Sequence, residues 1–211
     1  MLAALSLALS SVASSAASYS FTPSPNDLYD LDHHAAFAWR IDNINLSGVP
    51  IQSASLTFTN IRNWDNSPNF LFTHLLDTAK AAGVSWFIDS WDTVVSGSDI
   101  ADNFAGSLFA SNPLVTATTG NTFLASPSFS MTGTDFTITF SAAQIAILQN
   151  YISHGNDIAF GLDPDCHYYN DGIRFTITTG STAAVPDSGS TALLLALALP
   201  AFAVLRRRLA V

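Results

Sequence analysis

The densest group of side chains that could bind a metal or carry out a reaction lies between residues 162 and 172. This segment reads Leu-Asp-Pro-Asp-Cys-His-Tyr-Tyr-Asn-Asp-Gly, and its oxygen ligands are Asp163, Asp165, Asn170 and Asp171. Carboxylate and amide oxygens are the ligands that Ca²⁺ prefers, so these four residues predict a calcium site. The spacing is not that of an EF-hand, and a structural zinc site needs more ligands than Cys166 and His167 supply.

Two other interpretations of this segment stay open. Asp and Asn side chains in loops often accept hydrogen bonds from nearby backbone amides, so the segment could simply tie down the strand that follows it. A catalytic role is the third interpretation, but the chain contains no Glu and no Gly-x-Ser-x-Gly, phosphate-binding or His-Glu-x-x-His motif. Cys166 and His167 are adjacent, so on an extended strand they would point to opposite faces. We therefore expect a protein without enzymatic activity.

A second polar cluster, Asp27-Leu-Tyr-Asp-Leu-Asp-His-His34, precedes the first clearly alternating segment. The first and last strands of a β-sandwich are often neighbours. We therefore expect Asp30, Asp32, His33 or His34 to face the loop at 163–171.

Alternation of apolar and polar residues is the main structural signal of the body. It recurs in short segments separated by Asn, Asp, Gly, Ser and Pro: 37–42, 53–61, 84–89, 135–140, 157–162 and 172–178. Such spacing predicts an all-β fold, an antiparallel β-sandwich of jelly-roll type. Residues 70–82 are compatible with either a strand or a short helix.

One short helix is predicted, and we expect it to cap the sandwich. Ser141-Ala-Ala-Gln144 has the capping-box pattern, and apolar residues follow it at helical spacing up to Gly155. Trp39, Trp64, Trp86 and Trp91 could stack against sugars, although aromatic residues at alternating strand positions usually belong to the core. Of the four, Trp64 lies in a turn-like segment and is expected to be the most exposed.

The charge balance excludes one class of partner. All 16 acidic residues are Asp, and the part before Val185 holds 15 of them against four Lys and Arg residues. An anionic surface repels phosphate backbones, so nucleic-acid binding is not expected. A single cysteine also excludes an intrachain disulfide framework.

Both ends of the chain look like targeting segments. Residues 1–18 combine an apolar stretch with small residues near Ala16–Ser18, which is typical of a secretory signal peptide, although no Lys or Arg precedes the stretch. At the other end, Thr191–Leu205 is apolar and is followed by Arg206, Arg207 and Arg208. We expect residues 191–211 to form a short transmembrane helix whose arginines stop transfer on the cytoplasmic side.

The C-terminal segment resembles a known sorting signal. Val185-Pro-Asp-Ser-Gly189, a short apolar helix and a terminal Arg cluster occur in the order seen in the VPDSG variant of the PEP-CTERM signal. The resemblance implies that Val185, Pro186, Asp187, Ser188 and Gly189 are recognised by an exosortase, a membrane-embedded cysteine transpeptidase. It also implies that the tail is removed, or exchanged for a surface attachment, after export. An ordinary tail-anchored protein that keeps its C-terminus is the alternative.

These observations predict four parts: a signal peptide at 1–18, a β-sandwich at 19–179, a linker with the sorting motif at 180–190, and the transmembrane end at 191–211. We expect an exported protein of the cell envelope, outer surface or extracellular matrix, held transiently in the membrane. Its expected partners are the secretion machinery, the exosortase and extracellular polysaccharide. A binding or structural role is the favoured function, and a Ca²⁺-dependent glycan-active enzyme is the alternative.

Overall fold

The structure is a computed structural model that describes residues 16–32, 34–46, 48–88 and 102–180. Within it, Ala17–Gly180 forms one compact unit. Nearly all of the predicted signal peptide, the sorting motif and the predicted transmembrane end lie outside the described residues. In the part of the chain that is described, no helix combines the length and apolar character needed to cross a membrane.

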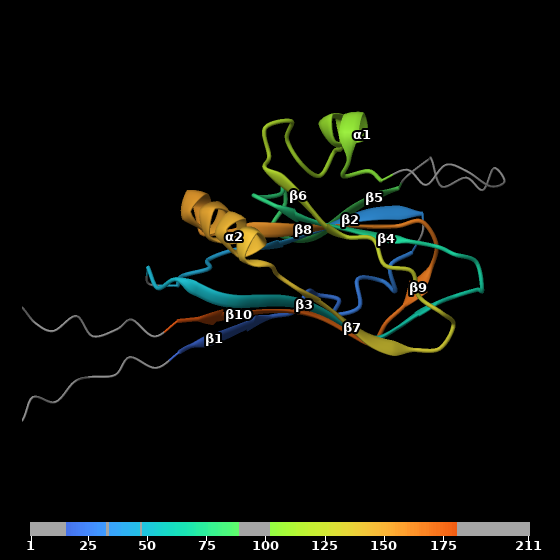
Figure 1. Cartoon of the computed structure of the whole chain (residues 1–211). Helices are drawn as coiled ribbons and strands as arrows, with labels where there is room; N and C mark the ends of the chain where they lie inside the picture. The colour runs from blue at the N-terminus through green and yellow to red at the C-terminus, as the bar shows by residue number, and fades with distance from the viewer. Residues whose placement is uncertain (1–15, 33, 47, 89–101, 181–211) are drawn as a thin grey trace, which may run out of the picture. The chain divides into compact units, whose positions relative to one another are not determined.

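Two antiparallel sheets form the body and confirm the predicted sandwich (Figure 1). The first has the order β1-β10-β3-β7, and β9 pairs with β3 beside this path; the strands are β1 (Ser18–Phe21), β10 (Gly172–Thr179), β3 (Ile51–Asn63), β7 (Thr134–Thr139) and β9 (Tyr168–Tyr169). The second has the order β5-β2-β8-β4-β6, with β5 (Gly83–Ile88), β2 (Ala35–Ile41), β8 (Ile158–Pro164), β4 (Leu71–Leu76) and β6 (Asn121–Ala125). The ambiguous segment at 70–82 thus contains a strand.

Alternation along each strand decides which side chains enter the core. In β10, Ile173, Phe175 and Ile177 are buried, whereas the side chains between them are exposed or half-buried. The first sheet therefore turns one apolar face inward, as period-two patterning requires. Phe175 meets Phe160 of β8 edge-on, with ring centroids 4.9 Å apart, so the two sheets are in contact through aromatic side chains.

β8 differs from the other strands because all seven of its residues are buried. Its inner face belongs to the main core, and its outer face is covered by the segment that contains α1 (Gly106–Ser111). Phe104 packs so closely over Gly161 that a Cβ atom there would come within 2.7 Å of the phenyl ring. The sequence predicted a single helix, so α1 and this second small core were missed.

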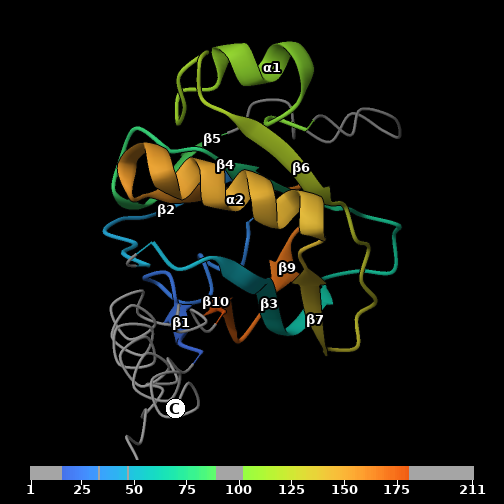
Figure 2. The same ribbon diagram turned by 60° about the vertical axis from the view of Figure 1, so that its left-hand side comes forward.

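The predicted capping helix is present as α2 (Ala142–Gly155). Ser141 accepts a hydrogen bond from the Gln144 amide, and the Gln144 side chain accepts one from the Ser141 amide, which confirms the capping box. α2 contacts β3 of the first sheet and β8 of the second, so it closes one side of the sandwich (Figure 2). Leu148, Tyr151 and Ile152 join the main core.

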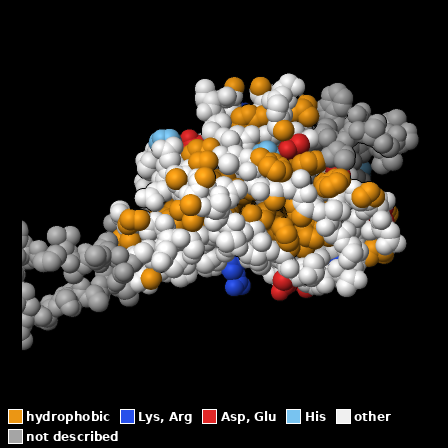
Figure 3. All heavy atoms as spheres, in the orientation of Figure 1, with side chains coloured by type: hydrophobic (Ala, Val, Ile, Leu, Met, Phe, Trp, Pro, Cys, Tyr) orange, Lys and Arg blue, Asp and Glu red, His pale blue; other side chains and the backbone are white. Residues whose placement is uncertain are grey.

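Few charged side chains are visible on the surface, as the low content of Lys and Arg leads one to expect. The face in Figure 3 carries few charged side chains, and hydrophobic atoms are visible in a band between the two layers. On the outer side of the first sheet the strands present short hydroxyl side chains instead, which follows from their alternation with the buried residues: Ser18, Ser20, Ser53, Ser55, Thr57, Thr59, Thr137, Thr139, Thr176 and Thr178.

Candidate functional site

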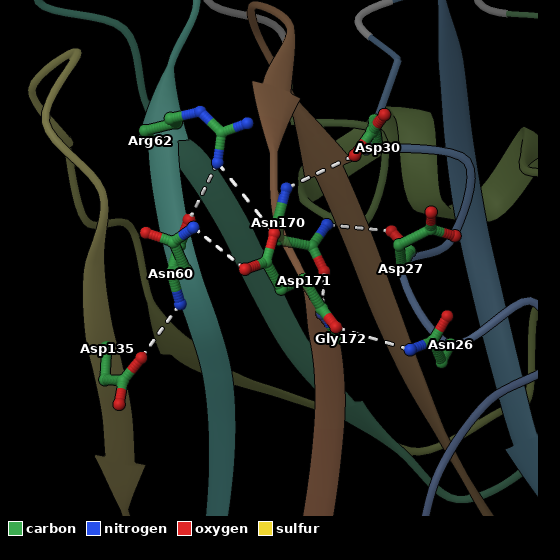
Figure 4. A network of polar contacts seen from close by, with 9 residues as sticks. All are labelled: Asn26, Asp27, Asp30, Asn60, Arg62, Asp135, Asn170, Asp171 and Gly172. Atoms are coloured by element: carbon green, nitrogen blue, oxygen red, sulfur yellow. Dashed lines mark hydrogen bonds and ion pairs between the residues drawn. The ribbon is translucent and has the colours of Figure 1, made fainter.

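The two polar clusters singled out in the sequence do meet, at one end of the sandwich (Figure 4). The Asn170 side chain donates to the Asp27 carbonyl at 2.8 Å, and the Asn170 backbone amide donates to Asp30 Oδ1 at 3.3 Å. Asn170 Oδ1 also accepts from the Gly172 amide at 3.0 Å. Through these bonds the Asn170 side chain, which is only 5% exposed, links the N-terminal loop to the start of β10.

Asp171 continues the network toward β3. Its Oδ2 accepts from the Asn60 side chain at 2.9 Å, and its Oδ1 lies 4.0 Å from an Arg62 guanidinium nitrogen. The Asn60 backbone amide in turn donates to Asp135 Oδ1 at 2.8 Å. Asn60 has φ +50° and lies where the register between β3 and β7 shifts, so the network surrounds a bulge in β3.

The N-terminal loop in this network has an unusual backbone. Four consecutive residues without a glycine among them, Leu28–Leu31, have φ between 46° and 58°. Left-handed conformations cost an L-residue roughly 1–2 kcal/mol each, so tertiary contacts must hold this turn in place. Leu28 and Leu31 are completely buried, and the Tyr168 amide donates to the Leu31 carbonyl at 3.4 Å.

The four predicted calcium ligands are directed to different places. Asp163 is 4% exposed, and its Oδ2 accepts from the Asn103 amide at 2.6 Å on the outer side of the second sheet. Asp165 Oδ1 accepts from the Phe70 amide, whereas Asn170 and Asp171 belong to the network around β10. Across the described ranges, no three His, Cys or Asp side chains gather as a metal-binding group. The predicted set therefore does not form one ligand sphere, and the contacts of Asn170 and Asp171 are those of a loop that ties down the final strand.

Asp165 holds its proton more tightly than an ordinary Asp side chain. Burial raises its pKa from 3.8 to about 6; the Phe70 amide opposes this shift and the nearby charge of Asp65 adds to it. Burial raises the pKa of Tyr168 as well, with further contributions from Asp165, Cys166 and Asp65. These groups lie where the loop after β3 meets the loop after β8.

The tryptophan side chains differ in their exposure. Trp64 is 55% exposed, as expected, and the Arg62 guanidinium carbon lies 5.2 Å from the centre of the Tyr169 ring. Trp39 is buried in the core, whereas Trp86 on β5 is 50% exposed, contrary to the expectation for a strand residue. Trp91 lies outside the described residues.

His74 is a buried polar residue that the sequence analysis did not single out as a functional residue. It lies on β4, is 3% exposed, and its two ring nitrogens are each 2.8 Å from an oxygen, one of Asn121 and one of Asp102. Phe104 and Phe123 flank the ring. The arrangement fixes the segment after residue 101 to the outer side of the second sheet. The surrounding sequence has no motif that would have revealed it.

Residues 185–189 and 206–208 lie outside the described residues, and it is comparison with known families that identifies them. Residues 184–209 match the family described as VPDSG-CTERM motif, a PEP-CTERM-like exosortase sorting signal, as the sequence analysis predicted. Comparisons with curated proteins and with solved structures give no match.

Proposed function

We propose, from the premise that residues 184–209 are a VPDSG-CTERM sorting signal, that an exosortase processes this protein after export and that the sandwich then acts at the cell surface or in the extracellular matrix. The motif carries the first part of the proposal, since it implies an exported protein sorted to the cell envelope. The second part concerns the body, for which we propose a binding or structural role.

The composition of the tail explains how processing would work. As a helix, the apolar run Thr191–Leu205 would extend about 22 Å, at about 1.5 Å per residue, whereas a hydrocarbon core is about 30 Å thick. Pro200 interrupts it further. Such a segment suits a temporary hold that keeps Val185–Gly189 beside a membrane-embedded enzyme, much as a hydrophobic tail holds the substrate in other anchor-exchange signals.

The surface of the body supports contact with extracellular polysaccharide. The outer side of the first sheet presents rows of Ser and Thr hydroxyl groups, such as Thr57 and Thr137, whose side-chain oxygens are 2.9 Å apart. Hydroxyl groups can donate and accept hydrogen bonds, and the exposed ring of Trp64 offers a face on which a sugar can stack. A glycan ligand is therefore the partner class that we propose.

The sorting proposal is tested by the intact mass of the surface form. We expect a protein that has lost its C-terminal Arg cluster, and Pro186→Ala with Asp187→Ala should leave the chain uncleaved in the membrane. Ser181→Ala, just before the motif, is the matched control and should be processed normally. A mature protein that still ends at Val211 would contradict the proposal.

A glycan-active enzyme is the second candidate, and one observation favours it. The raised pKa of Asp165 is in the range that suits a general acid near neutral pH. Incubation of the protein with a panel of polysaccharides separates the two functions. Binding without product supports the binding role, whereas turnover that Asp165→Asn abolishes and Asp135→Asn preserves would establish the enzyme.

A further inference from the structure

A covering segment, residues 102–120, lies on the outer side of the second sheet (Figure 2). Its side chains Phe104, Leu114 and Val115 are buried, and the buried side chains of β2, β4 and β8 beneath them are mostly alanine: Ala36, Ala38, Leu76 and Ala159. An alanine side chain buries little apolar area, so these contacts contribute less than those of the main core. The polar contacts at the two ends of the covering segment therefore matter for keeping it closed.

One side chain, His74 of β4, contacts both ends of the covering segment. Its Nε2 is 2.8 Å from Asp102 Oδ2, at the first residue of the segment. Its Nδ1 is 2.8 Å from Oδ1 of Asn121, the first residue of β6, which follows the segment directly. His74 is 3% exposed, so water does not easily replace either contact. The imidazole therefore joins both ends of the covering segment to the sheet.

Both partners of the imidazole present an acceptor to it. Asn121 Nδ2 donates to the Phe104 carbonyl, so Oδ1 is the Asn121 atom that faces His74. Asp102 Oδ1 accepts from the Phe104 amide at 2.9 Å, and Oδ2 faces His74. A neutral imidazole carries one N–H, so it would turn a nitrogen lone pair toward an oxygen 2.8 Å away. Since a carboxyl group is a stronger acid than imidazolium, Asp102 is the anion and both ring nitrogens of His74 carry protons.

The other groups around the ring favour the same protonation state. Phe104 of the covering segment and Phe123 of β6 flank the ring, with centroids 5.9 and 5.3 Å from it. On β8, Gly161 lies opposite His74, and Asp163 lies on the same outer face and accepts from the Asn103 amide at 2.6 Å. Besides His74, the ionisable side chains of β4, β6, β8 and the covering segment are Asp102 and Asp163. Both are acidic, and an acidic neighbour favours the imidazolium form.

We propose that His74 is a pH-sensitive clasp, which holds the covering segment closed while its ring carries two protons and releases it when one proton is lost at alkaline pH. Release follows because the neutral ring meets an oxygen with a lone pair and leaves the largely buried Asp102 carboxylate without its cation. In an unfolded chain an ordinary histidine loses this proton near about pH 6.5, so above that pH the folded state holds a proton that the unfolded state does not. The contribution of the clasp to stability is therefore present at acidic pH and is lost as the pH rises. Opening exposes the apolar outer face of the second sheet, and this inference does not depend on sorting or on glycan binding.

The test is amide hydrogen exchange of the full chain in detergent, followed by mass spectrometry at about pH 6 and about pH 9, on either side of the ordinary range of histidine. Each rate is divided by the intrinsic rate of an unprotected amide at that pH. We expect the protection of residues 104–120 to fall by about tenfold or more between the two conditions, while that of α2 stays the same. Equal protection of residues 104–120 at both pH values would overturn the proposal.

Asp102→Asn separates the clasp from a purely structural contact. Asn keeps an oxygen for the Phe104 amide and places an NH₂ group opposite His74 Nε2, so a neutral ring can make both bonds. The variant should stay closed at both pH values. Asp32→Asn is the matched control, because Asp32 lies 3.9 Å from another histidine, His167, and this variant should open like the wild type. An Asp102→Asn protein that keeps the wild-type pH dependence, or that is already open at the lower pH, would overturn the proposal.

A measurement on the wild type keeps the proposal testable if Asp102→Asn does not fold. Nitrogen-15 NMR of histidine-labelled protein at about pH 7.5, where an ordinary histidine is largely neutral, reports the protons on each ring. We expect both ring nitrogens of His74 to be protonated, whereas the exposed His154 should be largely neutral. A His74 ring with one bare nitrogen at this pH would overturn the proposal.

Discussion

Replacement of Asn170 should remove the contacts that hold the N-terminal loop against the last strand. In Asn170→Ala the bond to the Asp27 carbonyl at 2.8 Å and the bond from the Gly172 amide at 3.0 Å are both lost. Asn170 is 5% exposed, so water does not easily replace them. At about 1–2 kcal/mol for each backbone group left without a partner, the free energy of unfolding should fall by about 2–4 kcal/mol. That loss is a large part of the free energy of unfolding of a typical domain, which is roughly 5–15 kcal/mol.

The assay is urea unfolding followed by tryptophan fluorescence, with Asn66→Ala as the matched control. Asn66 is exposed and forms no side-chain hydrogen bond in the described structure, so its loss should change stability by no more than about 0.5 kcal/mol. Asn170→Asp adds a second test. It keeps the acceptor for the Gly172 amide but places an oxygen opposite the Asp27 carbonyl, so it should be at least as destabilising at pH 7 and recover as the introduced carboxyl is protonated. If Asn170→Ala is no less stable than Asn66→Ala, the reasoning is refuted.

Two further predictions concern the same end of the sandwich. Burial raises the pKa of Asp165 from 3.8 to about 6, so the folded state holds this proton more tightly than the unfolded state. The free energy of unfolding should therefore fall as pH rises from about 4 to about 6, and Asp165→Asn should remove that part of the pH dependence; identical pH profiles of the variant and the wild type would count against this reasoning. Tyr29 has φ +58° and is 56% exposed, so Tyr29→Gly should relieve backbone strain and raise the free energy of unfolding by about 0.5–1 kcal/mol, in contrast to Tyr29→Ala, which keeps the strain. The urea midpoints of the wild type, Tyr29→Gly and Tyr29→Ala measure this difference in stability.

Local patterns in the sequence were sufficient for most of the regular structure. The capping box at Ser141 and Gln144 and the helix that follows depend on contacts within a few residues, and both occur as predicted. The alternating segments that became β2, β3, β7, β8 and β10 likewise depend on residues two apart. β1 and β6 were missed because they are short, and α1 because its six residues carry no capping side chain.

The polar site depends on strand pairing, which local patterns do not contain. Asn170 and Asp27 are 143 residues apart in sequence, and they meet only because β1 and β10 are neighbours. The sequence predicted that the two clusters would face each other, but its reason was wrong: β2, the first strand that it identified, lies in the other sheet, and the missed strand β1 is the neighbour of β10. It could not predict that Asp163 points to the outer side of the second sheet, since that depends on its position in β8 and on the cover supplied by the segment after residue 101.

The sequence by itself therefore determined the sorting signal, the sandwich class and the capped helix, because each is encoded in adjacent or regularly spaced residues. Only the tertiary structure decided which carboxylates share an environment. Asp65 and Asp165 lie 100 positions apart, yet the charge of Asp65 adds to the rise in the pKa of Asp165, because β9 pairs with β3 and the Asp165 amide is hydrogen-bonded to the Phe70 carbonyl. The left-handed turn at Leu28–Leu31 also depends on the tertiary structure, since burial of Leu28 and Leu31 and a hydrogen bond from the distant residue Asn170 add to its local hydrogen bonds.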